Sequence, residues 1–158
     1  MSGLAWKDRQ WGNFLVLPSS GWNWFSLQLD DGNDLMLFVL RDPTGAVSPV
    51  SGTLVLPNGQ ASPIPAGAAS VTSTGTWQSP HNGATYPSGW RVVLPERDLD
   101  LTLTPVLLDQ ELDTKSGIGS TYWEGEVTVA GRSAGQVASG HGYVELTGYA
   151  RTPDSAAP

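Results

Sequence analysis

The chain lacks several residue types that common functional sites require. It contains no cysteine among its 158 residues, which excludes a disulfide framework, a thiolate metal site and a cysteine nucleophile. Its two histidines, His81 and His141, are far apart in the sequence, and no second nitrogen ligand lies beside either. A catalytic zinc usually has three protein ligands that include histidine, so we expect no metal. The sequence also contains no P-loop or dinucleotide fingerprint.

Positive charge and long apolar runs are also scarce. Eight Lys and Arg stand against fifteen Asp and Glu, giving a net charge of −7 and a pI near 4.5. A nucleic-acid partner is therefore not expected, because binding to phosphates needs the opposite sign. The longest mostly apolar stretch, residues 35–40, is far short of the roughly 20 residues of a membrane helix. The first thirty residues carry no signal-peptide pattern, so we expect a cytoplasmic or membrane-peripheral location.

Glycine and proline, in contrast, are abundant. Nineteen glycines and twelve prolines leave little room for helices. Between them the sequence alternates apolar and polar residues in short segments, which is typical of antiparallel strands. We predict strands at residues 22–30, 35–41, 53–56, 70–77, 90–94, 100–108, 121–130 and 136–150, with a further one around residues 6–11. The Ala- and Pro-rich residues 60–69 are predicted to form a loop.

About nine strands without a convincing helix predict an all-β fold. A chain of this length forms either a sandwich or a barrel. Aromatic residues on both faces of several strands, with polar residues on one, favour an antiparallel β-barrel that is closed or nearly so. We expect one domain over residues 1–151. The small, proline-bounded tail at 152–158 is predicted to be disordered.

The first candidate site is the segment Trp6-Lys7-Asp8-Arg9-Gln10-Trp11. At strand spacing Trp6 and Asp8 point to the same side. A carboxyl group between aromatic neighbours is a candidate acid, because desolvation raises its pKa toward neutrality. The alternative is that Asp8 pairs with Arg9 or another arginine on a barrel rim.

A second candidate is the pair Trp22 and Trp24, which form a flat aromatic wall on one face of a strand. Such a wall suits stacking on a polyene or stabilising a carbocation, although a core or domain-interface cluster is the alternative. We expect Trp24, Ser26 and Gln28 to line the barrel cavity. The opposite faces, which carry Phe25, Leu27 and Leu29 or Val144 and Leu146, would then pack outward.

A third candidate combines two later strands. Tyr122 shares a strand face with Glu124, and Tyr143 shares one with Glu145. Two carboxyl groups on paired strands can divide acid and base roles if their surroundings separate their pKa values. Alternatively, one of them forms a buried ion pair with Arg41 or Arg91. Asp109-Gln110-Glu111 adds acids that otherwise belong to a solvated loop, and His81 either lines a barrel mouth or faces water.

Several short sequence motifs, taken in order along the chain, carry a resemblance to a known family. They are Trp6-x-Asp8-Arg9-Gln10-Trp11-Gly12, Trp22-x-Trp24-Phe25-Ser26-Leu27-Gln28-Leu29-x-Asp31-Gly32, Leu35-Met36-Leu37, Gly52-Thr53-Leu54, Trp77-x-Ser79-Pro80, Tyr86-Pro87-x-x-Trp90, Asp109-Gln110-Glu111, Tyr122-Trp123-Glu124-Gly125 and Gly142-Tyr143-Val144-Glu145-Leu146-Thr147-Gly148-Tyr149. Over residues 3–150 the chain resembles the carotenoid 1,2-hydratase (hydroxyneurosporene synthase) and AttH-like family. It is similar to the C-terminal one of that family's two lipocalin-like barrels.

The resemblance implies an activity and a set of residues. The family adds water to the terminal trisubstituted double bond of acyclic carotenoids without a metal or redox cofactor. An acid protonates the alkene, aromatic faces stabilise the carbocation, and a polar group directs water. The family's acid motif maps onto Trp6 and Asp8, although its hydratases usually have Tyr and His where this chain has Trp6 and Lys7. We assign catalysis to Asp8, Trp6 and Glu124, and substrate binding to Trp24, Ser26, Gln28, Tyr122, Tyr143 and Glu145.

Three functions remain open on this reading. The first is a cofactor-independent hydratase or isomerase acting on a polyene or terpenoid alkene. The second is a cyclase of the pericyclase type, whose shaped cavity preorganises its substrate. The third is a barrel that binds an apolar ligand without chemistry. Because the family's N-terminal barrel has no counterpart in this sequence, we also expect a homodimer in which a second copy takes its place.

Overall fold

The protein is an all-β molecule in the computed structural model, which describes residues 21–42, 44–114 and 121–150. Its elements, in chain order, are β1 (Gly21–Leu29), β2 (Asp34–Arg41), β3 (Ser51–Val55), β4 (Ala61–Ile64), β5 (Ser70–Gln78), β6 (Thr85–Leu94), the 3-10 turn η2 (Pro95–Arg97), β7 (Leu99–Pro105), β8 (Glu111–Asp113), β9 (Thr121–Ser133) and β10 (Gln136–Thr147). No helix in these ranges is long and apolar enough to cross a membrane.

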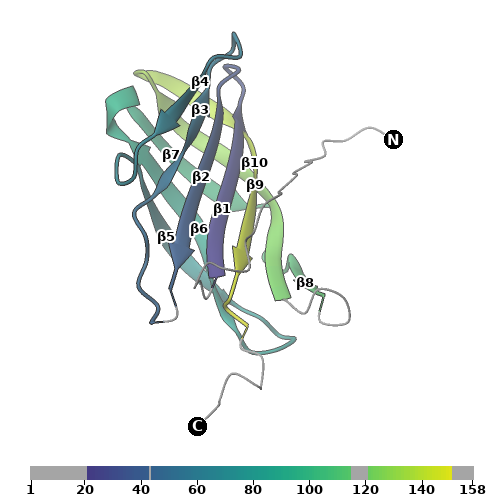
Figure 1. Ribbon diagram of the computed structural model, residues 1–158. Coiled ribbons are helices and arrows are strands. Elements are labelled where there is room, and N and C mark those ends of the chain that lie inside the picture. Colours follow the sequence, from purple (N-terminus) through teal and green to yellow (C-terminus); the bar gives the residue numbers. More distant parts are fainter. Residues whose placement is uncertain (1–20, 43, 115–120, 151–158) are drawn as a thin grey trace.

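The ten strands form one antiparallel sheet in the order β4-β3-β2-β1-β10-β9-β7-β6-β5, and β8 pairs with β9 at its start. Two meanders, β1–β4 and β5–β10, are joined where β1 pairs with β10. The sheet curls so that β1, β2 and β3 lie in front of β6 and β7 (Figure 1). The described strands β4 and β5 do not pair, so the sheet is a curled, lipocalin-like half-barrel. This confirms the all-β, lipocalin-like prediction.

The interior is filled by apolar side chains from nearly every strand. On β1, Phe25 and Leu27 are fully buried and Leu29 nearly so. Their neighbours in the core include the large rings of Trp90 on β6 and Trp123 on β9, whose centroids lie 5.8 Å apart. Alternation along each strand therefore directs one set of side chains inward and leaves the other set on the convex outer face.

The expected assignment of the two faces of β1 is wrong. Phe25, Leu27 and Leu29 point into the core, as Val144 and Leu146 do on β10. By alternation, the predicted cavity-lining residues lie on the outer face: Trp24, Ser26, Gln28, Tyr122, Glu124, Tyr143 and Glu145. The reason is that the inner positions of β2, β7 and β9 are mostly apolar, with Arg41 at the end of β2 as the charged exception. Burying the matching apolar face of β1 against them fixes its orientation, and a one-residue shift would have inverted every side chain.

Three local predictions are also corrected. Residues 61–64 form β4, although their Ala- and Pro-rich composition predicted a loop; a short edge strand tolerates Pro63 because one side of it needs no partner. Glu111–Asp113 forms β8, which was not expected, and β6 begins five residues earlier than predicted, at Thr85. The predicted strand around residues 6–11 and the predicted tail at 152–158 lie outside the described residues.

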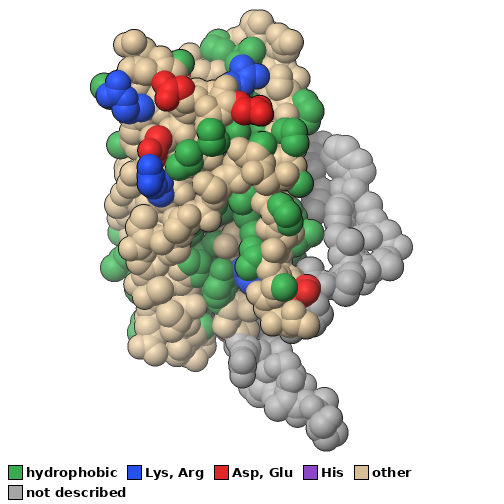
Figure 2. All heavy atoms as spheres, turned by 90° about the vertical axis from the view of Figure 1, so that its left-hand side faces the viewer, with side chains coloured by type: hydrophobic (Ala, Val, Ile, Leu, Met, Phe, Trp, Pro, Cys, Tyr) green, Lys and Arg blue, Asp and Glu red, His purple; other side chains and the backbone are tan. Residues whose placement is uncertain are grey.

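One face of the half-barrel is hollowed. Figure 2 looks from the left-hand side of Figure 1, where the edges of the two meanders lie, and shows hydrophobic side chains and a basic group inside the hollow. The edge strand β5 is exposed at most positions, including Ser73 and Gly75, which face inward by alternation. The interior is therefore less covered beside β5 than at the centre of the sheet.

Candidate functional site

The outer face of β1, β10 and β9 brings the sequence-predicted site residues together. Trp24 lies directly opposite Glu145, and Glu145 lies opposite Glu124 on the next strand. Ser26 lies opposite Tyr143 in the adjacent row. We call the group Trp22, Trp24, Tyr122, Glu124, Tyr143 and Glu145 the outer cluster. All six side chains are half-buried.

Specific contacts hold the outer cluster. The Trp22 indole Nε1 donates a hydrogen bond to Glu145 Oε1 at 2.8 Å. The Trp22 ring meets Tyr122 edge to face, with centroids 6.4 Å apart. Gln28 Nε2 donates to Ser26 Oγ at 2.9 Å, which satisfies a serine hydroxyl that is only 2 % exposed. The cluster therefore combines aromatic faces with two carboxyl groups held at a fixed spacing by strand pairing.

The two carboxyl groups of the outer cluster have different surroundings. Burial raises the pKa of Glu124 above its ordinary value, and no described residue donates a hydrogen bond to its side chain. Glu145 accepts the Trp22 indole N–H. Burial, and then the charges of Glu124 and Glu145, raise the pKa of Tyr143. Glu124 therefore keeps its proton more readily than an ordinary glutamate, whereas Glu145 is held as a hydrogen-bond acceptor. Acid–base chemistry needs such a division between a proton donor and a proton acceptor.

Neither Arg41 nor Arg91, the two arginines considered from the sequence, pairs with Glu124 or Glu145. Arg41 was an alternative partner for Glu124 or Glu145, but it lies on the inner face of β2. Arg91 instead binds Asp100 on the surface, with its Nη2 2.6 Å from Asp100 Oδ2. The candidate acid Asp8 and its neighbour Trp6 lie outside the described residues.

A second polar group, which the sequence reasoning did not assemble, lies at the end of the barrel where β1 starts and β2 ends. Arg41 Nη1 donates to Asn23 Oδ1 at 2.6 Å and to the Tyr149 hydroxyl at 2.8 Å. Arg41 Nη2 donates to the carbonyl of Thr147. The Arg41 Cζ also lies 4.0 Å from the centre of the Tyr149 ring. These partners are more than 100 residues from Arg41, except Asn23, so no local motif predicts them.

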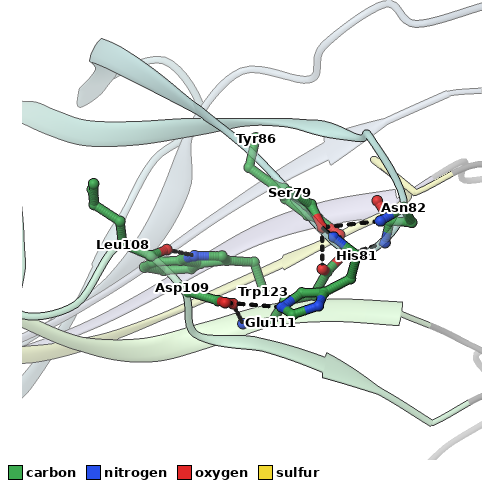
Figure 3. Close-up of polar contacts among 8 residues, drawn as sticks. All are labelled: Ser79, His81, Asn82, Tyr86, Leu108, Asp109, Glu111 and Trp123. Carbon is green, nitrogen blue, oxygen red and sulfur yellow. Dashed lines mark hydrogen bonds and ion pairs between the residues drawn. The ribbon is translucent and has the colours of Figure 1, made fainter.

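At the same end, Glu111 is the acceptor for three donors from the β5–β6 hairpin. The hydroxyl of Tyr86 donates to Glu111 Oε1 at 2.7 Å and Asn82 Nδ2 donates at 2.5 Å, while Ser79 Oγ donates to the other oxygen. Figure 3 shows these side chains converging on Glu111. Residues 109–111, for which a solvated loop was the alternative, therefore connect β8 to the β5–β6 hairpin through the hydrogen bonds of Glu111. Burial and the bond to Glu111 raise the pKa of Tyr86.

The nearby Ser79, His81 and Asp109 do not form a catalytic triad. The His81 ring Nε2 lies 2.8 Å from Asp109 Oδ2, and both side chains are largely exposed. Ser79 Oγ donates to Glu111 and accepts the backbone N–H of His81, not a ring nitrogen (Figure 3). A serine nucleophile would need the ring as its base. Across the described residues, no group of three or more His, Asp or Glu side chains is arranged to hold a metal ion.

A curled antiparallel half-barrel with an acid-and-aromatic face defines a lipocalin-like protein with a candidate acid–base site. The AttH-like family model matches residues 1–149, and the chain belongs to the AttH-like family. No curated protein matches the chain.

Two solved structures are similar to it. A Nitrosomonas europaea protein assigned to AttH has 36 % identity and a TM-score of 0.74, covering 87 % of this chain and 41 % of its own. Kievitone hydratase from Nectria haematococca (C2 SG) has 26 % identity and a TM-score of 0.72, covering 88 % and 42 %. The chain thus spans about two-fifths of the length of these relatives.

Proposed function

We propose that this chain contributes to a hydratase that adds water to a carbon–carbon double bond of an apolar substrate, without a metal or redox cofactor. The observation that carries the proposal is the pairing of Glu124 and Glu145 on an aromatic face, with burial raising the pKa of Glu124. Support comes from membership of the AttH-like family and from similarity to kievitone hydratase, whose name states a hydration.

In the proposed reaction, protonated Glu124 delivers its proton to one alkene carbon. The alkene's π electrons form the new C–H bond and leave a cation on the neighbouring, more substituted carbon. The faces of Trp22 and Trp24 stabilise this cation through their π electrons. Water then forms the C–O bond and gives its proton to the Glu145 carboxylate. Release of that proton to solvent and uptake of one by Glu124 restore the starting state, so the net change is the addition of one water molecule.

Asp8 is the alternative acid, on the strength of its aromatic neighbours in the sequence and of the family motif. Two variants separate the two candidates. Glu124→Gln and Asp8→Asn each keep the size of the side chain and remove the transferable proton. Glu126→Gln is the matched control, because Glu126 lies on the same face of β9 but is exposed, 3.3 Å from His141 Nδ1.

The test incubates the purified chain with kievitone and with an acyclic isoprenoid polyene and follows the gain of one water by mass spectrometry, in ordinary and in heavy-oxygen water. We expect Glu124→Gln to lower the rate by about 10²–10⁴-fold, the usual contribution of a general acid, while Glu126→Gln keeps it. If Asp8→Asn loses the hydration activity while Glu124→Gln keeps a normal rate, Asp8 is the acid and Glu124 is not. A normal rate in both variants would contradict hydration at the outer cluster.

A further inference from the structure

Arg41 differs from the other arginines that the structure describes. Of Arg41, Arg91, Arg97 and Arg132, only Arg41 is not exposed. It follows Leu37 and Val39 on the inner face of β2, so its side chain belongs to the concave side of the sheet. Within the described ranges, no carboxylate oxygen lies within 4.0 Å of its guanidinium, whereas Arg91 has Asp100.

The hydrogen bonds of Arg41 go to neutral acceptors. Asn23, Tyr149 and the Thr147 carbonyl take three of the five N–H groups of the guanidinium. Two N–H groups are left without a partner in the described part of the chain. Burial lowers the pKa of Arg41, as expected for a cation withdrawn from water without a counter-ion. A half-buried charge in this condition is stabilised by an anion more than by any neutral group.

A row of aromatic rings adjoins this cation. Tyr149, against which Arg41 stacks, lies 5.4 Å from Tyr86 between ring centroids, and Tyr86 lies 5.8 Å from Trp77. Trp77 lies on the exposed edge strand β5, on the inner side that faces the hollow. The hydroxyl of Tyr86 is bonded to Glu111, whose carboxylate is already engaged by three donors. Tyr86 itself is fully buried, so the accessible apolar surface of the row consists of Trp77 and Tyr149, with the positive charge of Arg41 beside Tyr149.

We propose that Arg41 binds the carboxylate of an elongated amphiphilic ligand whose apolar part lies along Tyr149 and Trp77, with the buried ring of Tyr86 supporting both. A guanidinium with two N–H groups to spare matches the two oxygens of a carboxylate. The aromatic row matches an apolar chain, because such sites combine apolar walls with few polar anchors. This inference does not depend on the proposed hydration, since a barrel without catalytic activity would bind the same ligand in the same way.

The test compares decanoate with 1-decanol, which share an alkyl chain and differ in charge, by titration calorimetry below micelle-forming concentrations. We expect wild type to bind decanoate at least about tenfold more tightly than decanol, the scale of one charge-assisted hydrogen-bonded pair. Arg41→Gln should abolish that preference. Arg91→Gln is the matched control: it changes the net charge equally, at an exposed position, and should keep the preference.

Arg41 also joins β2 to β1 and to the segment after β10, so circular dichroism must first show that Arg41→Gln is folded. If it is not, Arg41→Lys replaces it, because lysine keeps the charge but loses the two-pronged geometry. Weaker decanoate binding by Arg41→Lys with unchanged decanol binding would support the site. Equal binding of the two probes by wild type, or an unchanged preference in the folded Arg41 variant, would overturn the proposal.

Discussion

Phe25 and Trp90 meet edge to face, with ring centroids 5.7 Å apart, although three strands separate β1 from β6 in the sheet. The contact exists because the sheet curls until the inner faces of distant strands, here β1 and β6, come together. At this level, described side chains from opposite sides of the half-barrel are in contact. The protein's stability therefore depends on the inner positions of strands that are distant in the sheet.

Phe25→Ala is expected to lower the free energy of unfolding by about 3–5 kcal/mol, because it removes a fully buried ring and leaves a cavity beside Trp90. Gln28→Ala, on the opposite face of the same strand, should cost less, about 1–2 kcal/mol, because it removes only the hydrogen bond to the buried Ser26 hydroxyl. Urea unfolding followed by tryptophan fluorescence measures both. Similar losses in the two variants would contradict the assignment of inner and outer faces.

Glu124 should make stability depend on pH in a defined direction. Its pKa is raised above the ordinary 4.5, so the folded state holds the proton more tightly than the unfolded state does. The stabilising contribution is complete below that ordinary value and is lost as pH rises through the raised pKa. Glu124→Gln should therefore gain stability relative to wild type as pH rises from acid to neutral. Melting temperatures across this range test the trend, with Glu126→Gln as control; a gain confined to low pH would contradict it.

Tyr86 should ionise later than an ordinary tyrosine. Burial and Glu111 raise its pKa above 10.0, so the folded state keeps the proton and loses stability as pH rises past that value. In an alkaline titration followed by tyrosinate absorbance, Tyr86→Phe should remove amplitude only from the last step. The same variant should cost about 1–3 kcal/mol at neutral pH, since it removes a buried hydrogen bond to a carboxylate. Tyr143→Phe, at a half-buried site on the outer face, is the control and should cost less.

A homodimer remains a prediction from the sequence, and one exposed patch suggests where it forms. Leu107 and Leu108, at 63 % and 57 % exposed, lie beside the exposed Val106 and near Leu112 in the sequence. Light scattering over a hundredfold dilution should give twice 16.7 kDa, and the double variant Leu107→Glu, Leu108→Glu should give the single mass. Val137→Glu, at 85 % exposed on β10, is the control. A constant mass near 16.7 kDa in wild type would rule out the dimer.

The strands and turns of the sheet were largely predictable from sequence. Alternation in residues 22–30 and 35–41, with Asp31-Gly32-Asn33 between them, predicted the β1–β2 hairpin, because local backbone preferences determine such turns. The grouping of Glu124 with Glu145 also followed, since both strands were identified and paired correctly. Their role in catalysis stays a prediction, as does that of Asp8.

The orientation of the faces and the polar end of the barrel were not predictable. Both faces of β1 carry aromatic residues, so alternation alone could not tell which is buried. Arg41 and Tyr149 are 108 residues apart, and Tyr86 and Glu111 are 25 apart. Such contacts depend on how the sheet curls, and a short stretch of sequence does not predict that curvature. Tyr149 and Glu111 belong to sequence motifs, but nothing in the sequence assigns their partners.

The joining of two meanders through β1 and β10 has a consequence during synthesis. β1 to β4 can pair among themselves as soon as they leave the ribosome, and so can β5 to β9. No strand of one half pairs with a strand of the other until residues 136–147 emerge, because β10 pairs with β1 on one side and with β9 on the other. Until then the inner face of each half, including Phe25 and Trp90, lacks the surface that covers it. The chain must therefore keep two apolar sheets from associating with other molecules until the last described strand is made, which is the interval in which chaperones would matter most.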